Sequence, residues 1–460
     1  PAPVAYDIAN SCRFNDGDSA YMEISPASDG SNTTATFSAW VKRCNLGARQ
    51  AIFGGQEGTD TNNRCVLEFN ASDQLVMQTG NAGSFVNKKS TRLFRDCSAW
   101  YHLVFQFDTT NGTAASRWKF FVNGVEETVL STDQTFPDSA DIKFFENTTS
   151  CRIAVGMKPE GSNNVQFFDG YMAEVVVIDG SVLAPTSFGE FDSRSPTIWK
   201  PKDVSELTFG TNGFYLDFED SANLGNDANG GTDLTETNLD ATDQATDTPT
   251  NNFATANPLS GNAEAFAQGN LHITDRAATD ASYGACSTIG LIKGKWFVEI
   301  KCTAVGSGND IGLLRAGGEI SIAGDYQFSD GNLTYRKEGQ KTAMDGTYSP
   351  TISSYGDSYA TGDILAIALD MDNRDVYFYK NGVVQDSGTA AFTSSNIDAD
   401  TFYFVFQSGY NTGMCEWNFG GCNTYAISSG NADANGYGNF EYAVPSGYYA
   451  ICTKNLAEFG

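Results

Sequence analysis

The sequence predicts an all-β protein built from two β-sandwich domains that are joined by an acidic, extended linker. Residues 119–125 (KFFVNGV) and 377–383 (YFYKNGV) each form an alternating, aromatic-rich run that leads into Asn-Gly. Asn-Gly tolerates the positive φ angles at both central positions of a type I′ turn, so each run predicts a tight β-hairpin. Because the two runs lie on either side of a stretch of different composition, they favour two separate sandwiches.

Length and composition agree with this prediction. The chain has 460 residues, which suits two domains that each bury their own core, and it contains 47 Gly, 20 Tyr and 32 Phe. Glycine supplies turns, and aromatic side chains suit pleated, half-buried surfaces. The best helical candidate is a turn or two near residues 183–188, so little helix is expected.

The first domain is expected over residues 1–200. Short strands alternate there with turns rich in Asn, Asp and Gly, at a spacing typical of a sandwich. The predicted strands include residues 20–24, 35–41, 66–69, 101–107 and 173–178.

An acidic stretch over residues 201–261 separates the two predicted domains. Residues 203–275 contain no Lys or Arg, and residues 219–252 contain no aromatic residue. Such a composition cannot bury enough apolar surface to form a core of its own. The stretch is therefore either a tether or an extended strap over a neighbouring domain. In the second case three leucines would pin it: Leu224, Leu234 and Leu239.

The formal charge of −28, from 28 Lys and Arg against 56 Asp and Glu, excludes some partners. A field of this sign repels phosphate backbones and anionic membrane surfaces, so nucleic acid is not expected as a partner. No apolar run approaches the ~20 residues of a membrane span, so membrane insertion is not expected either. The acidity is interpreted mainly as a solvated surface, and its many oxygens also suit hard cations such as Ca²⁺.

Ten cysteines, five on each side of the acidic stretch, predict buried free thiols and not a disulfide framework. An odd number in each domain does not close on itself, and the chain has no Cys-x-x-Cys pair. This favours assembly in a reducing cytoplasm. Cys415 and Cys422 remain near enough in sequence to pair.

The first domain resembles the laminin-G-like jelly rolls of the concanavalin type. Residues 13–18 (RFNDGD), 37–42 (FSAWVK), 100–105 (WYHLVF) and 168–174 (FDGYMAE), with the hairpin at 121–124, occur in the order of that family. The resemblance implies a jelly-roll sandwich of the kind that serves more often in binding than in catalysis.

The second domain, expected over residues 262–460, resembles the SPRY family. Residues 294–299 (GKWFVE) and 362–370 (GDILAIALD) look like the opening and central strands of that family. Residues 377–383 look like its hairpin, and residues 417–420 (WNFG) like its last core strand. The resemblance implies a second β-sandwich of the jelly-roll type.

Three further phrases are similar to virion proteins of tailed bacteriophages, in which a jelly roll, an acidic strap and a SPRY domain follow in this order. They are residues 224–227 (LGND), 247–252 (DTPTNN) and 445–456 (PSGYYAICTKNL). The resemblance implies a non-enzymatic tail fibre or capsid-decorating protein on the virion surface, made in the host bacterial cytoplasm. It also implies other virion proteins as partners, a homo-oligomer, and a host glycan or protein as ligand. Two alternatives remain open: a secreted carbohydrate-binding adhesin of a marine bacterium, and a jelly-roll glycoside hydrolase.

Four aspartates are candidate Ca²⁺ ligands, and no other cofactor is expected. Asp16, Asp18, Asp108 and Asp169 fall where laminin-G-like and lectin jelly rolls place oxygens near a bound ion. The alternative is that these residues form Asx turns at strand ends, as the Asp-Gly pairs at 16–17 and 169–170 suggest.

Loops of the second domain offer candidate ligand contacts. Carbohydrate recognition uses aromatic faces and planar polar groups on exposed loops. The candidates in Gly-, Ser- and Asn-rich loops are Tyr355, Tyr359, Tyr410, Asn411 and Tyr437. Core packing is the commoner role for any single one, but as a group they favour the second domain as the ligand-binding one.

No catalytic residue is predicted. A jelly-roll glucanase needs two carboxylates on one face of a strand, and the nearest candidates are Asp217 and Glu219 at the edge of the acidic stretch. His102 and His272 are too few for a His-based triad or a multi-His metal site, and His102 is expected to be structural.

Overall fold

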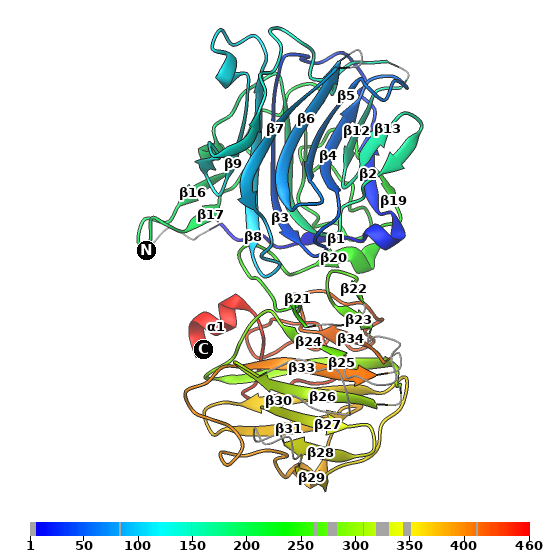
Figure 1. The fold of residues 1–460 in the computed structure, drawn as a ribbon, viewed down its shortest axis with the longest axis vertical. Helices are drawn as coiled ribbons and strands as arrows, with labels where there is room; N and C mark the ends of the chain where they lie inside the picture. The colour runs from blue at the N-terminus through cyan, green and yellow to red at the C-terminus, as the bar shows by residue number, and fades with distance from the viewer. Residues whose placement is uncertain are drawn as a thin grey trace. The chain divides into compact units, whose positions relative to one another are not determined.

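The computed structural model divides into two compact units, Pro1–Thr250 and Asn251–Gly460 (Figure 1). It describes residues 6–81, 84–148, 150–261, 263, 265–274, 283–306, 308–318, 331–343, 351–410 and 413–460. Within these ranges the only α-helix is α1 (Thr453–Phe459), so the predicted all-β fold is confirmed. No helix in this part of the chain is long and apolar enough to cross a membrane.

The first unit is a sandwich of two antiparallel sheets with eight strands each (Figure 1). The first sheet runs β10 (Val125–Glu126), β9 (Trp118–Val122), β8 (Trp100–Asp108), β3 (Thr34–Arg43), β15 (Gly170–Asp179), β1 (Ser11–Phe14) and β20 (Gln244–Ala245), and β18 (Phe214–Leu216) also pairs with β15. The second sheet runs β11 (Leu130–Asp133), β7 (Ser84–Leu93), β6 (Gln74–Asn81), β5 (Arg64–Phe69), β4 (Gln50–Gln56), β12 (Arg152–Val155), β2 (Tyr21–Ile24) and β19 (Thr235–Thr237).

The core of the first unit lies between these sheets and is rich in aromatic residues. Along β9 the burial alternates, so Trp118, Phe120 and Val122 face the core. Phe37 of β3 packs against Phe53 of β4 with ring centroids 4.7 Å apart. Burying one such side chain contributes roughly 1.5–3 kcal/mol, so the period of two decides which face of each strand turns inward.

The second unit has two further sheets, of seven and eight strands. One runs β21 (Ala256–Gly261), β24 (Tyr283–Ser287), β33 (Tyr403–Tyr410), β26 (Gly308–Arg315), β27 (Asn332–Arg336), β28 (Gln340–Ala343) and β29 (Thr351–Ser354). The other runs β22 (Ala265–Ala267), β23 (His272–Thr274), β34 (Met414–Asn418), β25 (Lys295–Ala304), β30 (Ile364–Asp370), β31 (Asp375–Lys380) and β32 (Val383–Val384), and β35 (Tyr449–Ala450) joins β25.

Both predicted Asn-Gly hairpins form. Asn123 and Gly124, between β9 and β10, have φ angles of 50° and 77°. Asn381 and Gly382, between β31 and β32, have φ angles of 49° and 79°. Positive values at both central positions are those of a type I′ turn, whose twist matches that of the flanking strands.

The C-terminal tail is part of the fold of the second unit. The buried carboxylate of Asp433 accepts hydrogen bonds from the backbone N–H groups of Tyr437 and Ala450. It also accepts one from the side-chain amide of Asn455 on α1, at 2.7 Å. One side chain therefore fastens the loop, the last strand and the helix together.

The acidic stretch is built into the two units: its residues up to Thr250 belong to the first, and β21 pairs with β24 of the second. Its strands β18, β19 and β20 pair with β15, β2 and β1. Leu224 and Leu234 are buried in the core between the sheets, and Leu239 packs against that core. The predicted boundaries at residues 200 and 261 therefore differ from the structural one after Thr250. Pairing with existing strands satisfies the backbone of a segment that is too polar to fold alone.

Asp247 fastens the end of this stretch. Its carboxylate accepts hydrogen bonds from Lys42 Nζ at 2.7 Å and from Trp100 Nε1 at 3.1 Å. Its carbonyl oxygen accepts a third from Ser11 Oγ at 2.6 Å. The Lys42 and Asp247 side chains are 0% and 2% exposed, and a buried ion pair of this kind is costly to break.

The ten cysteines are all buried and none forms a disulfide, as the sequence predicts. Cys415 lies directly opposite Cys302 on the neighbouring strand β25. The side-chain amide of Asn309 approaches the sulfur of Cys415 at 3.4 Å. These thiols therefore act as small core residues.

Replacing Asp247 with Asn is expected to destabilise the first unit by roughly 3–5 kcal/mol, because the buried Lys42 ammonium loses its carboxylate partner. Urea unfolding followed by tryptophan fluorescence measures the change. Glu126→Gln is the matched control: Glu126 and its partner Lys119 are 37% and 28% exposed, and a pair of that kind contributes about 0–1 kcal/mol. A loss below 1 kcal/mol for Asp247→Asn would contradict the role of the buried pair.

Candidate functional site

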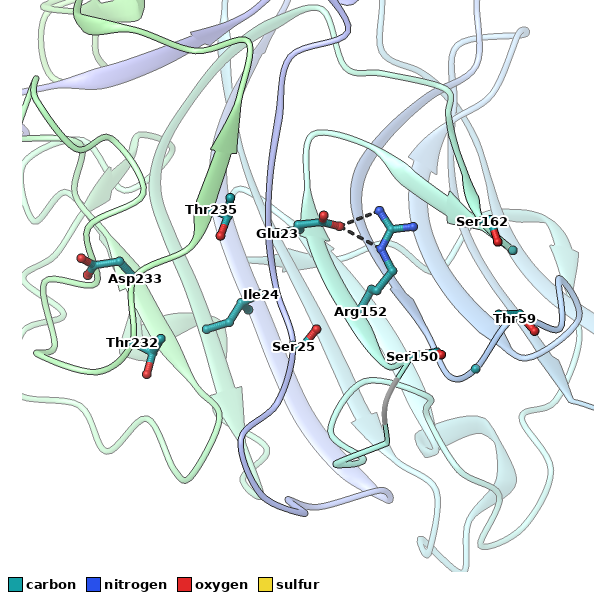
Figure 2. Close-up of a pocket in the computed structure, with 12 residues that line it drawn as sticks. Glu23, Ile24, Ser25, Thr59, Ser150, Arg152, Ser162, Thr232, Asp233 and Thr235 are labelled. Atoms are coloured by element: carbon teal, nitrogen blue, oxygen red, sulfur yellow. Dashed lines mark hydrogen bonds and ion pairs between the residues drawn. The ribbon is translucent and has the colours of Figure 1, made fainter.

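A polar pocket of about 620 Å³ opens on the first unit, over β2, β12 and β19 (Figure 2). It lies on the outer face of the second sheet, because Met22 and Ile153 turn into the core and their neighbours on the same strands turn outward. Hydroxyl-bearing and charged side chains dominate the lining. The lining residues are Glu23, Ile24, Ser25, Gly58, Thr59, Ser150, Arg152, Gly161, Ser162, Thr232, Asp233 and Thr235.

An ion pair between Glu23 and Arg152 forms the floor of this pocket. Arg152 Nε and Nη2 both donate to Glu23 Oε2, at 2.8 and 2.6 Å, as the dashed lines of Figure 2 show. Nη2 also donates to Asn164 Oδ1 at 2.6 Å. Glu23 lies opposite Ala154, whose small side chain leaves room for Arg152 to reach across diagonally. The Arg152 and Glu23 side chains are 20% and 30% exposed, so solvent reaches the pair.

Two loops form one wall, and Gln56 at the end of β4 holds them together. Its Nε2 donates to Gly58 O at 2.7 Å and to Gly161 O at 3.3 Å, and its Oε1 accepts from Gly161 N at 2.9 Å. Gly161 lies in the turn between β13 (Lys158–Glu160) and β14 (Asn163–Val165), with a φ of 64° that favours glycine. The buried amide of Gln56 therefore positions Thr59 and Ser162 on the same side of the pocket (Figure 2).

The opposite wall comes from the acidic stretch. Thr232, Asp233 and Thr235 lie on the far side of the Glu23–Arg152 pair in Figure 2. Thr235 is held there because β19 pairs with β2, which places it beside Glu23. The predicted linker therefore supplies a quarter of the twelve lining residues.

The ion pair leaves hydrogen-bonding groups available to a ligand. Within the described ranges, Arg152 Nη1 and Glu23 Oε1 make no hydrogen bond. A guanidinium nitrogen offers N–H donors and a carboxylate oxygen accepts, so the pair presents donors and an acceptor side by side. The surrounding serine and threonine hydroxyls both donate and accept. This chemistry suits a ligand that carries many hydroxyl groups.

A pair of carboxyl groups lies next to the rim at Gly58. A hydrogen bond with Glu57, and then burial, raise the pKa of Glu146 to about 7. Lys143 Nζ contacts Glu57 Oε2 at 2.7 Å. The two glutamates therefore share a proton below neutral pH, and the negative charge beside the pocket grows above it.

Of the four aspartates predicted as Ca²⁺ ligands, the structure brings only Asp16 and Asp169 together. Their carboxyl groups are hydrogen-bonded to each other, and Asp169 is 3% exposed. Burial, and then the charge of Asp16, raise the pKa of Asp169 well above its usual value. Asp18 instead accepts a hydrogen bond from Asn15 Nδ2.

Asp108 lies far from this pair. It is opposite Thr34 at one end of β3, whereas Gly170, which follows Asp169, is opposite Arg43 at the other end. A strand of that length spans about 30 Å, so Asp108 and Asp169 cannot share one ion. In the described ranges no group of three or more His, Cys, Asp or Glu side chains is placed to hold a metal ion.

Two of the tyrosines predicted to contact a ligand are buried in the second unit. Tyr355 and Tyr359 are 6% and 5% exposed, and both pack against Tyr335 in the core. Their hydroxyls donate to backbone carbonyl oxygens, which is how a buried tyrosine satisfies its polar end. A ligand therefore cannot reach these two residues.

Tyr437, Tyr410 and Asn411 are the other three residues predicted to contact a ligand. Tyr437 is half-buried against the core, where the ammonium of Lys454 lies 5.6 Å from its ring centre. Tyr410 is the last residue of β33, and Asn411 lies outside the described residues. For Tyr410 and Asn411 a ligand contact stays a prediction.

The carboxylates considered for glycoside hydrolysis do not share a strand face. Phe218 has a φ of 59°, which breaks the alternation between Asp217 and Glu219. Asp217 Oδ1 accepts the backbone N–H of Glu219 at 3.0 Å, so the two residues form an Asx turn. The geometry needed for a nucleophile and an acid is not formed by this pair.

His102 is a structural residue of the first unit. Trp199 Nε1 donates to His102 Nδ1 at 3.0 Å, so the ring proton sits on Nε2 and points to Ser38 Oγ at 2.9 Å. Burial lowers the pKa of His102 to about 3. The ring is therefore neutral and does not serve as an acid or a base near neutral pH.

The sequence predicted neither Glu23 nor Arg152 as a site residue. Glu23 stands on β2 (YMEI), where polar and apolar residues alternate, and this pattern indicates an outward direction for Glu23. On β12 (RIAV) Arg152 is the only polar residue, so no such alternation marks it. The two residues are 129 positions apart, however, and nothing local indicates that their strands are neighbours. The detectable signal was the alternation along β2, and the missing information was which strands are neighbours.

Comparisons with known proteins agree with a lectin-like first unit. A model of laminin G-type domains, described as the concanavalin A-like lectin/glucanases superfamily, matches residues 16–186, which confirms the family resemblance of this part of the chain. Among curated proteins, ATP-dependent RNA helicase DDX1 of Xenopus laevis is 29% identical over 122 residues, which are 26% of this chain and 15% of the helicase. The chain thus matches only a small part of that relative.

Several solved structures are similar to parts of the chain. The SPRY domain of human HERC1 is 18% identical, with a TM-score of 0.26, over 35% of this chain and 92% of its own. The CBM40 of the Ruminococcus gnavus IT-sialidase is 15% identical, with a TM-score of 0.26, over 36% and 94%. A heptameric SAP-like pentraxin from Limulus polyphemus is 14% identical, with a TM-score of 0.30, over 39% and 80%.

Replacing Asp169 with Asn is expected to flatten the dependence of stability on pH. The folded-state pKa of Asp169 lies above its unfolded value, so its stabilisation is complete below about pH 4 and is lost as the pH rises toward the folded pKa. The variant lacks this loss, so its melting temperature relative to the parent should increase from pH 4 to pH 8. Parallel melting curves would refute the assignment, and Asp96→Asn, an exposed position, is the control.

Proposed function

We propose that the chain is a non-enzymatic surface protein of a tailed bacteriophage virion, and that its first unit binds a glycan of the host surface. The proposed glycan binding rests on the Glu23–Arg152 pair, which is accessible to solvent at the floor of a hydroxyl-lined pocket. The virion part rests on the sequence phrases shared with fibre and decoration proteins. The proposal assigns the host contact to the first unit, whereas the sequence favoured the second.

The pocket has the features of a sugar-binding site. Sugar hydroxyls are recognised by planar polar side chains that are held in place before the ligand arrives, and the Glu23–Arg152 pair is held by its own hydrogen bonds and by Asn164. Two residues along the same face of β2, the ring of Tyr21 packs against Phe167 with centroids 6.1 Å apart. A half-buried aromatic pair of this kind offers a face to the apolar side of a sugar ring.

The arrangement favours binding over catalysis. Glu23 Oε2 already accepts hydrogen bonds from two nitrogens of Arg152. These bonds favour the ionised carboxylate, whereas a general acid must carry a proton to donate. A glycosidase also needs a second carboxyl group set across the scissile bond. Asp233, the other carboxylate of the lining, accepts the backbone N–H of Asp227 and stabilises its own loop.

A homo-oligomer on a particle fits a site of this size. A single open, polar pocket gives a weak interaction, because each hydrogen bond to sugar replaces one to water. Many copies on one particle that meet many copies of a glycan raise the avidity without any new contact. Repetition of the chain would therefore compensate for the modest affinity of one pocket.

Arg152→Ala is expected to reduce binding of the purified chain to a printed array of neutral and acidic oligosaccharides by about tenfold or more, since it removes the floor of the pocket. Arg194→Ala, an exposed arginine of the same unit outside the pocket, is the matched control and should bind as the parent does. Equal binding by both variants would remove this pocket from the proposal.

Mass spectrometry of purified virions tests the proposed location on the virion surface. Absence of the chain from the particles would contradict that location.

A further inference from the structure

We infer that the pocket selects a neutral sugar with two adjacent hydroxyls over a sugar that carries a carboxylate, and that Glu23 determines this selectivity. The inference rests on the proposed glycan-binding function and names the ligand class and the residue that discriminates. Nothing in the sequence pattern indicated it, because it depends on how Glu23 and Arg152 meet across two strands (Figure 2).

The hydrogen bonds of Arg152 restrict what it can recognise. Carboxylates are bound most strongly by two parallel N–H groups of a guanidinium. Here Nε and Nη2 are both directed at Glu23 Oε2, and Nη2 is also bound to Asn164 Oδ1. Only Nη1 remains, so the forked arrangement that a sugar carboxylate requires is already occupied by a carboxylate of the protein itself.

The groups that remain match a pair of neighbouring hydroxyls. Arg152 Nη1 donates, and Glu23 Oε1 accepts. A hydroxyl both donates and accepts, so one hydroxyl of the ligand can accept from Nη1 while its neighbour donates to Oε1. A carboxylate has no proton to donate, so it would leave Glu23 Oε1 unsatisfied and facing a second negative charge.

The charge of the lining points in the same direction. Its ionisable members are Glu23, Asp233 and Arg152, two acids against one base, in a chain with a formal charge of −28. Next to the rim, Glu57, Glu146 and Asp141 add three acidic groups against the single cation of Lys143. These carboxylates therefore repel an acidic sugar that approaches Arg152 Nη1, and Glu23 already neutralises the positive charge of Arg152.

Small residues stand next to Glu23 on the neighbouring strands of the sheet. Ala154, opposite Glu23, and Gly54, opposite Ala154 on β4, carry almost no side chain on the outer face. Pro159 of the β13–β14 hairpin covers Gly54, since a Cβ there would come within 2.6 Å of its ring. Ala154 is itself fully buried, so a ligand in the pocket lies against the Glu23–Arg152 pair and not against the strand next to it.

The test compares matched tetrasaccharides that differ only in a neutral or a carboxylated sugar, such as mannose and mannuronate chains, by isothermal titration of the full chain. The parent is expected to bind the neutral form at least fivefold more tightly. In Glu23→Gln the amide keeps an acceptor oxygen but releases Arg152 from its countercharge. Affinity for the acidic form should then rise about fivefold or more, while that for the neutral form changes less than about threefold.

Glu126→Gln is the matched control, because it removes the same charge from the same unit at a residue outside the pocket. It should leave the ratio of neutral to acidic affinity unchanged. Asp233→Asn provides a second variant that leaves the Glu23–Arg152 pair intact, and it should raise the acidic affinity by about twofold. Melting curves of each variant establish that it is folded.

The outcomes separate the inference from the proposed function. If the parent binds the acidic form as well as the neutral one, or if Glu23→Gln leaves the ratio unchanged, the inference is overturned while glycan binding stands. If the parent binds neither form nor any sugar of the array, the proposed function fails and the inference falls with it. In 0.5 M salt the discrimination should shrink, since screening weakens repulsion between exposed charges.

Discussion

The first unit depends on the attachment of its acidic segment. A stretch of more than thirty residues without an aromatic or a basic side chain has no means to fold alone, yet it completes the sandwich. Three short strands extend the sheets, two leucines enter the core, and Asp247 secures the end through a buried ion pair with Lys42. The pocket also depends on the attachment of this segment, because Thr232, Asp233 and Thr235 form one of its walls.

Carboxyl groups are stabilised in different ways in the core and at the pocket. Buried carboxyls such as Asp169, Glu174 and Asp310 have raised pKa values, to about 7 for the last two, because burial disfavours the ionised form. At the pocket, by contrast, Glu23 is solvated and paired with Arg152. In a protein with a formal charge of −28, the Arg152 guanidinium at this pocket is thus paired with a carboxylate of the protein itself.

The second unit illustrates why loop composition is a poor guide to a binding surface. Tyr355 and Tyr359 stand in segments rich in Gly and Ser, which is typical of exposed loops. Both rings nevertheless pack against Tyr335, and that of Tyr355 also packs against Phe378. A tyrosine is buried readily when its hydroxyl finds a carbonyl oxygen, and both residues do. Small neighbours bring the chain close to the sheet, so the same composition serves close packing as well as exposure.

The sequence alone determined the local structure. Asn-Gly at 123–124 and 381–382 fixed two type I′ hairpins, and alternation along β9 fixed the inward face, because both depend on residues close together in the chain. Tertiary structure alone decided the site and the fate of the acidic segment. Glu23, Arg152 and Thr235 lie on strands that are distant in sequence, and their order is set by the burial of the whole core. Long-range pairing of this kind carries no local signal, since the same strand can lie beside several others until the core selects one arrangement.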